Sequence, residues 1–476
     1  MTPFDIAIIG GGPGGYAAAI RAAQKGAQVC LVEKGRVGGT CLHRGCIPVK
    51  TLYATARRLV AMKHLAEHGI QVDGYRFDSG TALRRKDAVV SGLEKGIEGL
   101  LKSHGVELLR GEGTLEGPGQ VRIRCANVIG RIQARSIIIA SGARPFIPPF
   151  MTQGGDSVLT SDEFLNMEAL PKRLLIVGGG YIGCELAGIA ALFGGRVTLV
   201  EQLPELLSGI DRPAVREMEK NFQELGVEVL KGTAVQAVVK SGASVLVKLA
   251  GQEKELEVDK VLVAVGRRPN SANLGLEEAG VVLRNGAVAV DAGMRTSVDN
   301  VYAIGDVTNI LQLAHVADYQ GEVAVENALG GKAEADYRIV PATVFTFPEI
   351  AQVGLSEKEC REKKRNYRLG SFAYQASGKA QCDGETKGAA RLLAAAEDGR
   401  ILGGLVYGAE ASALIAEVAT AMRAGMSVGE LAGLIHAHPT LNEIIKEAAA
   451  DVLGAAVHKV GRRNRSAGSS SGETLG

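Results

Sequence analysis

The sequence predicts an α/β protein that contains two copies of one structural unit, followed by a C-terminal α+β domain. Three observations lead to this prediction. A strand, a glycine-rich turn, a helix and a second strand occur in that order near the start of the 476-residue chain, and occur again from about residue 174. Each copy is followed by the same short glycine-containing sequence. Beyond about Pro341 the pattern changes to strands of a mostly antiparallel sheet with interspersed helices.

The first copy begins with a run of apolar residues, which is typical of a parallel strand buried on both faces. Its parts are, in order, a strand over 6–9, the glycines Gly10, Gly12 and Gly15, a helix over 16–25, a strand over 29–32 and the acid Glu33. The first glycine permits a tight turn, the second lets a pyrophosphate approach the backbone, and the third allows close helix packing. The helix N-terminus faces the anion, and the acid is expected to bind ribose hydroxyls.

The second copy repeats this order. Its parts are a strand over 174–177, the glycines Gly178, Gly180 and Gly183 at the start of a helix, a strand over 197–200 and the acid Glu201. The acid follows the first glycine by 23 positions in both copies. We therefore predict two duplicated Rossmann-like dinucleotide-binding domains.

A short segment of similar sequence, here called an echo, follows each copy and supports the interpretation that the unit is duplicated. The first echo, Ala140-Ser141-Gly142-Ala143-Arg144-Pro145, ends an apolar strand over 137–139. The second, Ala264-Val265-Gly266-Arg267-Arg268-Pro269, ends an apolar strand over 261–263. Gly142 and Gly266 occupy matching places, and we expect both to lie beside a bound cofactor.

Two cysteines, Cys41 and Cys46, lie five positions apart shortly after the first acid. On an ideal helix such residues are about 140° apart around the axis and ~7.5 Å apart along it. A disulfide needs Cα atoms roughly 4.4–6.8 Å apart, so bridging requires a distorted helix. Gly45 and Pro48 are residues that permit and mark such a distortion. We interpret the pair as a strained, reducible disulfide beside a cofactor, the alternative being two structural cysteines.

The position of the cysteines indicates which cofactor binds to which copy. Cys41 follows Glu33 by only eight residues, so the first site should hold the redox ring that touches the sulfur pair. A flavin suits this place, because nicotinamide carries hydride but forms no ready relay with a thiolate while it stays bound. The second site is then predicted to bind NAD. An acid, Glu201, lies where a 2′-phosphate would sit, and no arginine follows in 202–204.

Two further carboxylates each have two interpretations. Asp306 ends a strand in Gly305-Asp306, where it can accept hydrogen bonds from a ribityl chain or cap a helix. Near the C-terminus, His438-Pro439-Thr440 precedes Glu443. The spacing from Thr440 to Glu443 has the form of a capping box. Alternatively, Glu443 orients the imidazole of His438 as a general base.

The composition limits the possible partners. The chain has 54 basic and 52 acidic residues, so nothing favours nucleic acid or an anionic membrane as the main partner. Its seven cysteines are scattered, which does not fit a secreted disulfide framework. Without a four-cysteine pattern, no metal site is predicted. No run of 18 apolar residues occurs and no targeting segment is recognised, so we expect a cytoplasmic protein without a membrane span.

These observations predict how the chain divides into domains. The expected parts are a first portion of the FAD-binding domain over 1–148, an NAD-binding domain over 149–272, a second portion of the FAD-binding domain over 273–340, an interface domain over 341–460, and a disordered tail over 461–476. The tail is rich in glycine, serine and arginine and cannot bury a core.

From residue 4 to about residue 458, the chain resembles the class I pyridine nucleotide–disulfide oxidoreductases. The motifs that carry the resemblance are the two glycine fingerprints, Gly39-Thr40-Cys41 to Cys46-Ile47-Pro48, Gly305-Asp306, Leu313-Ala314-His315, and His436-Ala437-His438-Pro439-Thr440 with Glu443. The histidine motif resembles the branch that oxidises dihydrolipoamide. The resemblance implies FAD-dependent oxidation of protein-bound dihydrolipoamide to lipoamide, with reduction of NAD to NADH.

The resemblance also implies roles for single residues. FAD would lie across the first glycine fingerprint, Glu33, Lys50, Asp306 and Ala314. Cys41 would exchange with substrate, and Cys46 would face the flavin as a thiolate. Lys50 would pair with Glu185, and Tyr181 would shield the flavin until NAD arrives.

The resemblance further implies a homodimer in which each active site takes His438 and Glu443 from the other subunit, with a cis bond before Pro439. As partners it implies lipoyl domains and the acyltransferase core of a 2-oxo acid dehydrogenase complex, or the glycine cleavage system. Two positions depart from the family pattern: His43 replaces a common Asn, and Val49 replaces a common Ser. They leave open an NADH-dependent disulfide or metal-ion reductase with a non-lipoyl acceptor. A flavoprotein with a mainly structural role in a complex is the other alternative.

Overall fold

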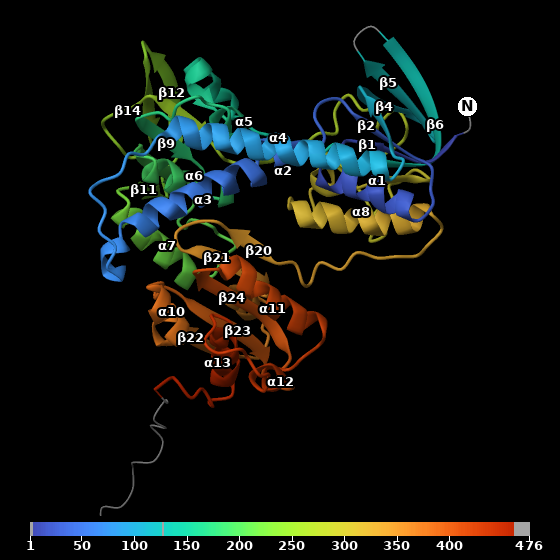
Figure 1. Cartoon of the computed structure of the whole chain (residues 1–476). Coiled ribbons are helices and arrows are strands. Elements are labelled where there is room, and N and C mark those ends of the chain that lie inside the picture. Colours follow the sequence, from blue (N-terminus) through green and yellow to red (C-terminus); the bar gives the residue numbers. More distant parts are fainter. Residues whose placement is uncertain (1–2, 126–127, 461–476) are drawn as a thin grey trace, which may run out of the picture. The chain divides into compact units, whose positions relative to one another are not determined.

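The structure is a computed structural model that describes residues 3–125 and 128–460. The chain divides into two compact units (Figure 1). Unit one comprises residues 1–208 and 222–337, and unit two comprises residues 209–221 and 338–476. The tail expected to be disordered, 461–476, lies outside the described residues.

The first copy forms a parallel sheet in unit one. Its strands, from one edge, are β3 (Glu107–Arg110), β2 (Val29–Glu33), β1 (Phe4–Ile9), β6 (Val128–Ile139) and β19 (Val301–Ala303). Ile8 packs toward α1 (Pro13–Gln24) and α8 (Ala314–Ala328), which lie side by side in Figure 1, whereas Ile9 belongs to the apolar cluster on the other face. Burial on both faces explains the unbroken apolar run that predicted β1.

The second copy forms a parallel sheet in which four strands have the same order, whereas its fifth strand precedes the others in the chain and that of the first copy follows them. Its strands are β11 (Glu228–Lys231), β10 (Arg196–Glu201), β9 (Arg173–Val177), β15 (Lys260–Val263) and β8 (Val158–Leu159). The glycine turn leads from β9 into α6 (Tyr181–Leu192). The predicted duplication of a Rossmann-like unit is therefore confirmed in the order and direction of the strands.

Each sheet carries an antiparallel addition that the sequence did not predict. In the first copy β4 (Glu112–Gly117) and β5 (Gln120–Cys125) pair with the long strand β6. In the second, β12 (Val235–Ser241), β13 (Ser244–Leu249) and β14 (Leu256–Val258) form a separate meander. Only the end of β6, at residues 137–139, is apolar without interruption. Residues 129–131 are exposed, and from 132 to 136 more buried residues alternate with exposed ones, as in a strand with one solvated face.

The two echoes pair with each other. They form β7 (Ala143–Pro145) and β16 (Arg267–Pro269), an antiparallel two-stranded ribbon in which Arg268 lies opposite Arg144. The sequence showed that the two segments resemble each other, but not that they are neighbours in space.

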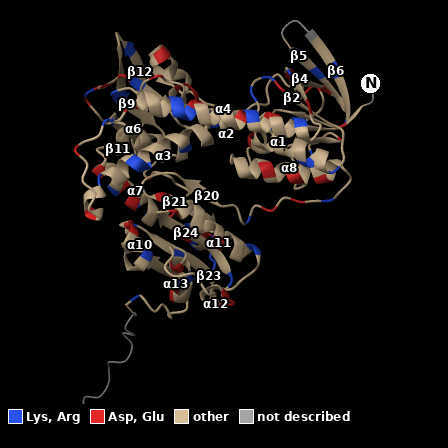
Figure 2. Ribbon diagram, viewed as in Figure 1, with Lys and Arg blue, Asp and Glu red and all other residues tan. Residues whose placement is uncertain are grey.

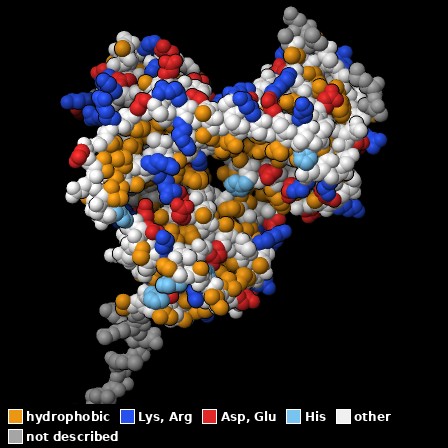
Figure 3. All heavy atoms as spheres, in the orientation of Figure 1, with side chains coloured by type: hydrophobic (Ala, Val, Ile, Leu, Met, Phe, Trp, Pro, Cys, Tyr) orange, Lys and Arg blue, Asp and Glu red, His pale blue; other side chains and the backbone are white. Residues whose placement is uncertain are grey.

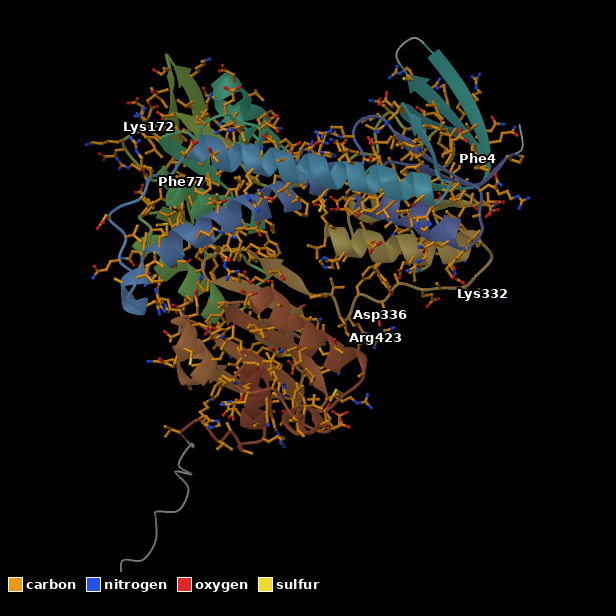
Figure 4. The ribbon with its side chains drawn as sticks, viewed as in Figure 1. Phe4, Phe77, Lys172, Lys332, Asp336 and Arg423 are labelled. Carbon is orange, nitrogen blue, oxygen red and sulfur yellow. The ribbon has the colours of Figure 1, made fainter. Side chains whose placement is uncertain are left out.

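Between β2 and β3 the first copy contains a helical insertion. It consists of α2 (Gly39–Arg44), α3 (Cys46–Met62), η1 (Leu65–His68) and α4 (Ser79–Ser103). Phe77, labelled in Figure 4, lies just before α4 and packs on Phe193 at the end of α6 with ring centroids 4.6 Å apart. The remaining elements of unit one are η2 (Pro149–Ser157), α5 (Ser161–Leu165), β17 (Leu283–Arg284), β18 (Ala287–Val288) and η3 (Gly305–Thr308). After α8 the chain passes Lys332 and Asp336 (Figure 4), where the Asp336 N–H donates to the Tyr319 hydroxyl at 3.0 Å.

Unit two is an α+β structure around an antiparallel sheet, as predicted. The strands, in spatial order, are β20 (Ala342–Val344), β21 (Glu349–Gly354), β24 (Ile401–Gly408), β23 (Ala389–Ala395) and β22 (Tyr367–Ala373). The helical elements are α9 (Glu357–Glu362), η4 (Tyr374–Ala376), α10 (Gly378–Asp383), α11 (Ala411–Arg423), α12 (Val428–Ala432) and α13 (Glu443–Val452). The division between the units falls within α7 (Arg212–Glu224). α11 and α13 bury their apolar faces on the sheet.

Basic and acidic side chains are interspersed along the ribbon and over the visible face of each unit (Figures 2 and 3). Across residues 3–125 and 128–460, none of the helices combines the length and apolar character that a bilayer crossing requires.

Candidate active site

The first glycine turn has the geometry that its three glycines predicted. Gly10 has φ +109°, and a Cβ placed there would lie 2.3 Å from the Ala140 carbonyl oxygen. A Cβ on Gly15 would lie 1.8 Å from the Gly10 carbonyl oxygen. At Gly12, by contrast, a Cβ would meet no described atom within 4 Å, so the backbone is open to a bound group on that side. The turn is thus closed where it packs and open where a pyrophosphate would approach.

The second glycine turn repeats these contacts. A Cβ on Gly178, where φ is +111°, would lie 2.4 Å from the Ala264 carbonyl oxygen. A Cβ on Gly183 would lie 1.9 Å from the Gly178 carbonyl oxygen, and at Gly180 a Cβ would meet no described atom within 4 Å. Both turns are therefore suited to the same kind of ligand.

Each predicted acid is tied to its own glycine turn. Glu33 accepts from the backbone N–H of Gly11 at 2.6 Å and from that of Gly35 at 2.6 Å. Glu201 accepts from the N–H groups of Gly179 at 2.6 Å and Leu203 at 2.7 Å. A carboxylate has about four lone-pair sites, so each acid retains acceptor capacity for ribose hydroxyls.

Gly142 and Gly266 lie where the two echoes join. Gly142 has φ +71° and its carbonyl accepts from the Asn270 N–H at 2.9 Å, while the carbonyl of Gly266 accepts from the Phe146 N–H at 3.1 Å. Both glycines cross-link the β7–β16 ribbon, and their predicted contact with cofactors stays a prediction.

The cysteine pair lies at a break between two helices. α2 ends at Arg44, Gly45 adopts φ −147° and ψ −110°, and α3 begins at Cys46 with Pro48 in its first turn. The distortion expected at Gly45 is therefore present. The predicted disulfide is open in this structure, where Cys41 and Cys46 are free thiols joined by a hydrogen bond.

The two thiols have opposite electrostatic environments. The hydrogen bond from Cys41, followed by the charge of Lys50, lowers the pKa of Cys46 to about 7, although burial and Glu185 oppose this. The same hydrogen bond, together with burial, raises the pKa of Cys41 above that of an ordinary thiol. Cys46 is thus the thiol that ionises first, and Cys41 is the donor that stabilises its thiolate.

An ion pair connects the insertion of the first copy to the helix of the second. Lys50 on α3 donates to both carboxylate oxygens of Glu185 on α6, at 3.0 and 2.9 Å, and Glu185 is buried. The pairing that the resemblance implied is therefore formed. Tyr181 is the first residue of α6, where burial raises the pKa of its hydroxyl.

A pocket of about 560 Å³ opens beside Cys41. The pocket is lined by Cys41 and by residues of two helices. These residues are Tyr16, Ala17 and Ile20 of α1 and Ala314, His315 and Asp318 of α8. Cys46 does not line this pocket. The structure thus distinguishes the two cysteines: only Cys41 lines the pocket, whereas Lys50 acts on both thiols and Glu185 on Cys46.

Asp306 lies in η3 at the end of β19, and burial raises the pKa of its carboxyl while Arg267 opposes this rise. Arg267 and Asp162 were not singled out from the sequence. Burial lowers the pKa of Arg267, whose charge also interacts with Asp162, Asp306 and Cys46. Arg267 follows the conspicuous Gly266, but nothing in the sequence around Asp162 distinguishes it from an ordinary residue in the first turn of a helix.

In unit two, Glu443 makes the contact with His438 and only one half of the contacts of a capping box. Its Oε1 lies 2.9 Å from Nδ1 of His438, and its Oε2 accepts from the Thr440 N–H at 3.0 Å. The Thr440 contact first, and then His438, lower the pKa of Glu443. The carboxylate therefore orients an exposed imidazole and accepts from the backbone just before α13. The capping box is not formed, since the N-cap of α13 is Asn442 without a side-chain cap bond, and the His438–Pro439 bond is cis.

The two departures from the family pattern flank the cysteines. Nε2 of His43 lies 2.7 Å from the Val37 carbonyl oxygen, and its Nδ1 is buried without a partner among the described residues. Val49 is buried. The other five cysteines lie apart from this site, with Cys30, Cys184 and Cys360 buried and Cys125 and Cys382 exposed.

The residues present fit two dinucleotides. FAD would be held at the open side of Gly12 and the α1 N-terminus, by Glu33, and by Asp306 with the buried Arg267, whose Nε has no partner among the described residues. NAD would be held by the corresponding parts of the second copy. Within residues 3–125 and 128–460, no group of three or more His, Cys, Asp and Glu side chains could hold a metal ion. Two nucleotide sites with a dithiol between them define a class of protein that moves electrons between a dinucleotide and a disulfide.

Comparisons with known proteins agree with this class. The family model described as pyridine nucleotide-disulphide oxidoreductase matches residues 4–321, and the dimerisation domain of the same family matches residues 340–449. The chain belongs to the pyridine nucleotide-disulphide oxidoreductase family. It is a flavoprotein oxidoreductase whose cofactors are FAD and NAD, and its C-terminal part is a dimerisation domain.

Several relatives are similar over nearly their whole length. A dihydrolipoyl dehydrogenase of Staphylococcus aureus is 40% identical over 458 residues, covering 95% of this chain and 97% of the relative. One of Geobacillus stearothermophilus is 40% identical over 455 residues, covering 95% and 96%. Among solved structures, LpdA of Mycobacterium tuberculosis has a TM-score of 0.88 at 30% identity, covering 93% of this chain and 98% of that one. The copper(II) complex of RclA, an HOCl-induced flavoprotein disulfide reductase of Escherichia coli, has a TM-score of 0.86 at 28% identity, covering 94% and 99%.

Proposed function

We propose that this chain is a dihydrolipoyl dehydrogenase, which oxidises a protein-bound dihydrolipoyl group and reduces NAD. The observation that carries the proposal is the separation of the two cysteines. Cys41 lines a pocket of about 560 Å³, within the size range of small-molecule sites, whereas Cys46 lies beside Lys50 with a pKa lowered to about 7. The 40% identity to a dihydrolipoyl dehydrogenase supports the choice of substrate.

The catalytic cycle starts from the oxidised Cys41–Cys46 pair. A substrate thiol loses its proton and the resulting thiolate attacks the sulfur of Cys41, because the thiolate is the nucleophile. The Cys41–Cys46 bond breaks, a mixed disulfide forms at Cys41, and Cys46 leaves as a thiolate. The second substrate thiol then loses its proton and attacks the substrate sulfur of the mixed disulfide. The bond from that sulfur to Cys41 breaks, the lipoyl ring closes, and Cys41 is released as a thiolate. When bound, FAD would supply the ring that accepts the electron pair of the dithiol, and NAD would be the final acceptor of hydride.

The chain's own residues favour each of these steps. Lys50 stabilises the charge on Cys46 as it leaves, and once Cys41 is released and protonated, its thiol can donate to the Cys46 thiolate as well. His438, oriented through its Nδ1 by Glu443, has its other nitrogen available to accept the substrate proton. Tyr181, at the start of α6, would cover the binding site of the nicotinamide ring until NAD binds.

We assign the chain to a homodimer in the cytoplasm. The match of residues 340–449 to a dimerisation domain supports a dimer, in which His438 and Glu443 of the partner subunit would complete each site. The partners would be lipoyl domains and the acyltransferase core of a 2-oxo acid dehydrogenase complex. The domain boundaries predicted from the sequence, at 148, 272 and 340, are part of this proposal.

The second candidate is a reductase of the same family with a different acceptor. The similarity to RclA, whose structure was solved as a copper(II) complex, favours this alternative, as do the unusual His43 and Val49 beside the thiols. An NADH-dependent reductase would use the same dithiol in the opposite direction, and the acceptor alone would differ.

The test is a comparison of substrates with the purified, FAD-loaded protein. Dihydrolipoamide is assayed with NAD, and glutathione disulfide and copper(II) are assayed as acceptors with NADH. We expect dihydrolipoamide to be oxidised with a kcat/KM at least about a hundredfold above that of the other couples, and turnover to require FAD. Turnover of glutathione disulfide or copper(II) without turnover of dihydrolipoamide would replace the proposal by the second candidate.

A further inference from the structure

The short helix α2, which carries Cys41 and precedes Cys46, is held at both ends by residues distant in sequence. Near its start, Nη2 of Arg267 lies 3.5 Å from the Thr40 hydroxyl oxygen. At its end, Nη1 of Arg44 lies 3.4 Å from Oδ2 of Asp162. A helix of six residues has too few internal hydrogen bonds to be stable alone, so such contacts determine where it lies.

The two residues that hold α2 are charged and largely withdrawn from water. Arg267 lies on β16, donates to the Ala143 carbonyl at 2.6 Å, and has a buried Nε without a partner among the described residues. Asp162 lies in the first turn of α5, and its Oδ1 is likewise buried and without a described partner. The open Nε of Arg267 belongs to the FAD site described above, whereas no cofactor contact is assigned to the buried Oδ1 of Asp162. An incompletely paired buried charge is costly, which points to a role beyond packing for Asp162.

These charges act on the thiol that ionises. β16 packs against η3, which contains Asp306, and α2 packs against α5. The charge of Cys46 responds mainly to the Cys41 thiol on α2, Lys50 on α3 and Glu185 on α6, and Arg267 on β16, which is tied to Thr40 beside Cys41, interacts with it more weakly. The charged groups that face Arg267 in turn are Asp162 on α5, Asp306 on η3 and Arg44 on α2.

We propose that Arg267 and Asp162 are positioning residues that clamp α2 and, with opposite signs, set the pH at which the redox dithiol becomes a thiolate. The Arg267 cation favours the thiolate of Cys46, and the Asp162 anion partly neutralises that cation. This inference rests on the proposed redox role of the Cys41–Cys46 pair. It goes beyond that role by adding a second cation to the one that Lys50 supplies.

The opposite signs make the inference testable. Replacing Arg267 by Met removes the cation, so the Cys46 thiolate should form at higher pH. Replacing Asp162 by Asn leaves the cation less neutralised, so the thiolate should form at lower pH. A purely structural disturbance of α2 would expose the thiols and move both variants in the same direction.

The measurement is the pH dependence of alkylation at each cysteine of the reduced, FAD-loaded protein. Iodoacetamide is added in short pulses between pH 5 and 9, and the products are quantified by mass spectrometry after trypsin digestion. Trypsin cuts after Arg36, Arg44 and Lys50, so Cys41 and Cys46 fall in separate peptides in these variants. The long-wavelength thiolate-to-flavin absorption band, followed against pH, gives a second reading of the same ionisation.

We expect the Cys46 midpoint in Arg267→Met to rise by about half to one pH unit, a roughly three- to tenfold smaller thiolate fraction at pH 6. In Asp162→Asn we expect a fall of similar size. Arg267→Lys should restore most of the effect because it restores the charge. Arg268→Met is the matched control, because Arg268 is on the same strand but stacks on Phe146, with its guanidinium carbon 3.7 Å from the ring centroid, and should leave the midpoint unchanged.

Equal midpoints in the wild type and both variants, or a shift of both in one direction, would overturn the inference. If Arg267→Met fails to bind FAD or to fold, Asp162→Asn and Arg267→Lys decide it, since the first must lower the midpoint and the second must keep it close to that of the wild type. Failure of the proposed function would be seen differently, as a wild-type protein that does not turn over dihydrolipoamide, whatever the midpoints of the variants are.

Discussion

The two glycine turns of unit one differ little in their own geometry, but the segments after them differ greatly. A Cβ on the first glycine would lie 2.3 Å from a carbonyl oxygen in one copy and 2.4 Å in the other. A Cβ on the third glycine would lie 1.8 and 1.9 Å from the carbonyl oxygen of the first glycine. The bond from the loop N–H to the acid is 2.6 Å in both. After Glu33, however, the chain enters the α2–α3–α4 insertion with its dithiol, whereas after Glu201 it passes through a loop to α7 and β11.

This difference shows how one repeated unit supports two roles. The repeated parts bind a nucleotide, and the chemistry lies in an insertion between the second and third strands of one copy. The insertion is connected to the other copy through the Lys50–Glu185 ion pair, where Glu185 belongs to the helix that opens the second nucleotide site. The second copy thus contributes to the ionisation of a thiol that it does not carry.

The largest expected effect comes from removing the thiolate of the first copy. Cys46→Ser should lower dihydrolipoamide turnover by more than about 10⁴-fold, because an essential member of a relay is lost. Transfer of hydride from NADH to bound FAD should remain, since it depends on the second copy and the flavin alone. Steady-state turnover and stopped-flow bleaching of the flavin measure the two halves separately.

The control for this variant is Cys382→Ser, at an exposed cysteine in unit two. It should behave as the wild type in both assays. Turnover by Cys46→Ser within tenfold of the wild type would mean that the insertion does not carry the chemistry, and the contrast between the two copies would lose its functional meaning.

The next effect tests whether the insertion depends on unit two. His438→Gln should slow dihydrolipoamide oxidation by about 10²–10⁴-fold, the usual contribution of a general base, without changing FAD content. Glu443→Gln should have a smaller effect, because its amide can still accept from Thr440 but no longer holds His438 by a charge. The pKa of Glu443 is lowered, so its carboxylate should keep orienting His438 down to a more acidic pH than an ordinary glutamate would, and lose this role only as the pH falls through the lowered value. Near-wild-type turnover by His438→Gln would remove that residue from the reaction.

The duplication was predictable from sequence because its signals are local. Glycines that avoid a clash with a neighbouring carbonyl and an acid that binds the same turn all lie within one unit of strand, helix and strand. The fully buried parts of the strands could also be predicted, since residues 6–9 of β1 and the end of β6 are apolar without a break. The antiparallel additions were missed because their strands, with one solvated face, alternate in polarity and carry no comparable motif.

The long-range parts of the site were only partly predictable. The two echoes could be recognised as similar, but pairing between β7 and β16 is a contact between segments more than a hundred residues apart in sequence. Asp162 and Arg267 are ordinary residues until the fold buries them beside α2. For Glu443, the sequence allowed a capping box or an orienting carboxylate, and only the structure shows that one oxygen orients His438 while the other accepts from the Thr440 N–H without completing a capping box.

A smaller effect compares the two acids. Glu201→Ala should weaken NAD binding by about 1.5–3 kcal/mol, the size of a hydrogen bond to a charged group, and should leave FAD content unchanged. Glu33→Ala should do the reverse. The Michaelis constant for NAD and the flavin absorbance per subunit measure the two effects. An unchanged Michaelis constant in Glu201→Ala would argue that this acid only supports its turn through Gly179 and Leu203.

The most exacting comparison uses the middle glycine of each turn. A Cβ at Gly12 or Gly180 would meet no described atom within 4 Å. Their backbones, with φ −69° and −79°, are open to any residue. Gly12→Ala should therefore stabilise the apoprotein by about 0.4–1 kcal/mol through the unfolded state. The same methyl group should weaken FAD binding by about 1–3 kcal/mol because it occupies the place where the pyrophosphate approaches.

Gly180→Ala should stabilise the fold in the same way and weaken only NAD binding. Thermal unfolding of the FAD-free proteins measures the expected stabilisation, and titration with each cofactor measures the expected loss of affinity. Gly15→Ala and Gly183→Ala are the opposite controls, since their new methyl groups would meet a carbonyl oxygen at 1.8 and 1.9 Å and should destabilise the fold itself. If Gly12→Ala bound FAD as tightly as the wild type, the open side of the first turn would not be the side that faces the pyrophosphate. The two copies would then share a fold but not a mode of binding their cofactors.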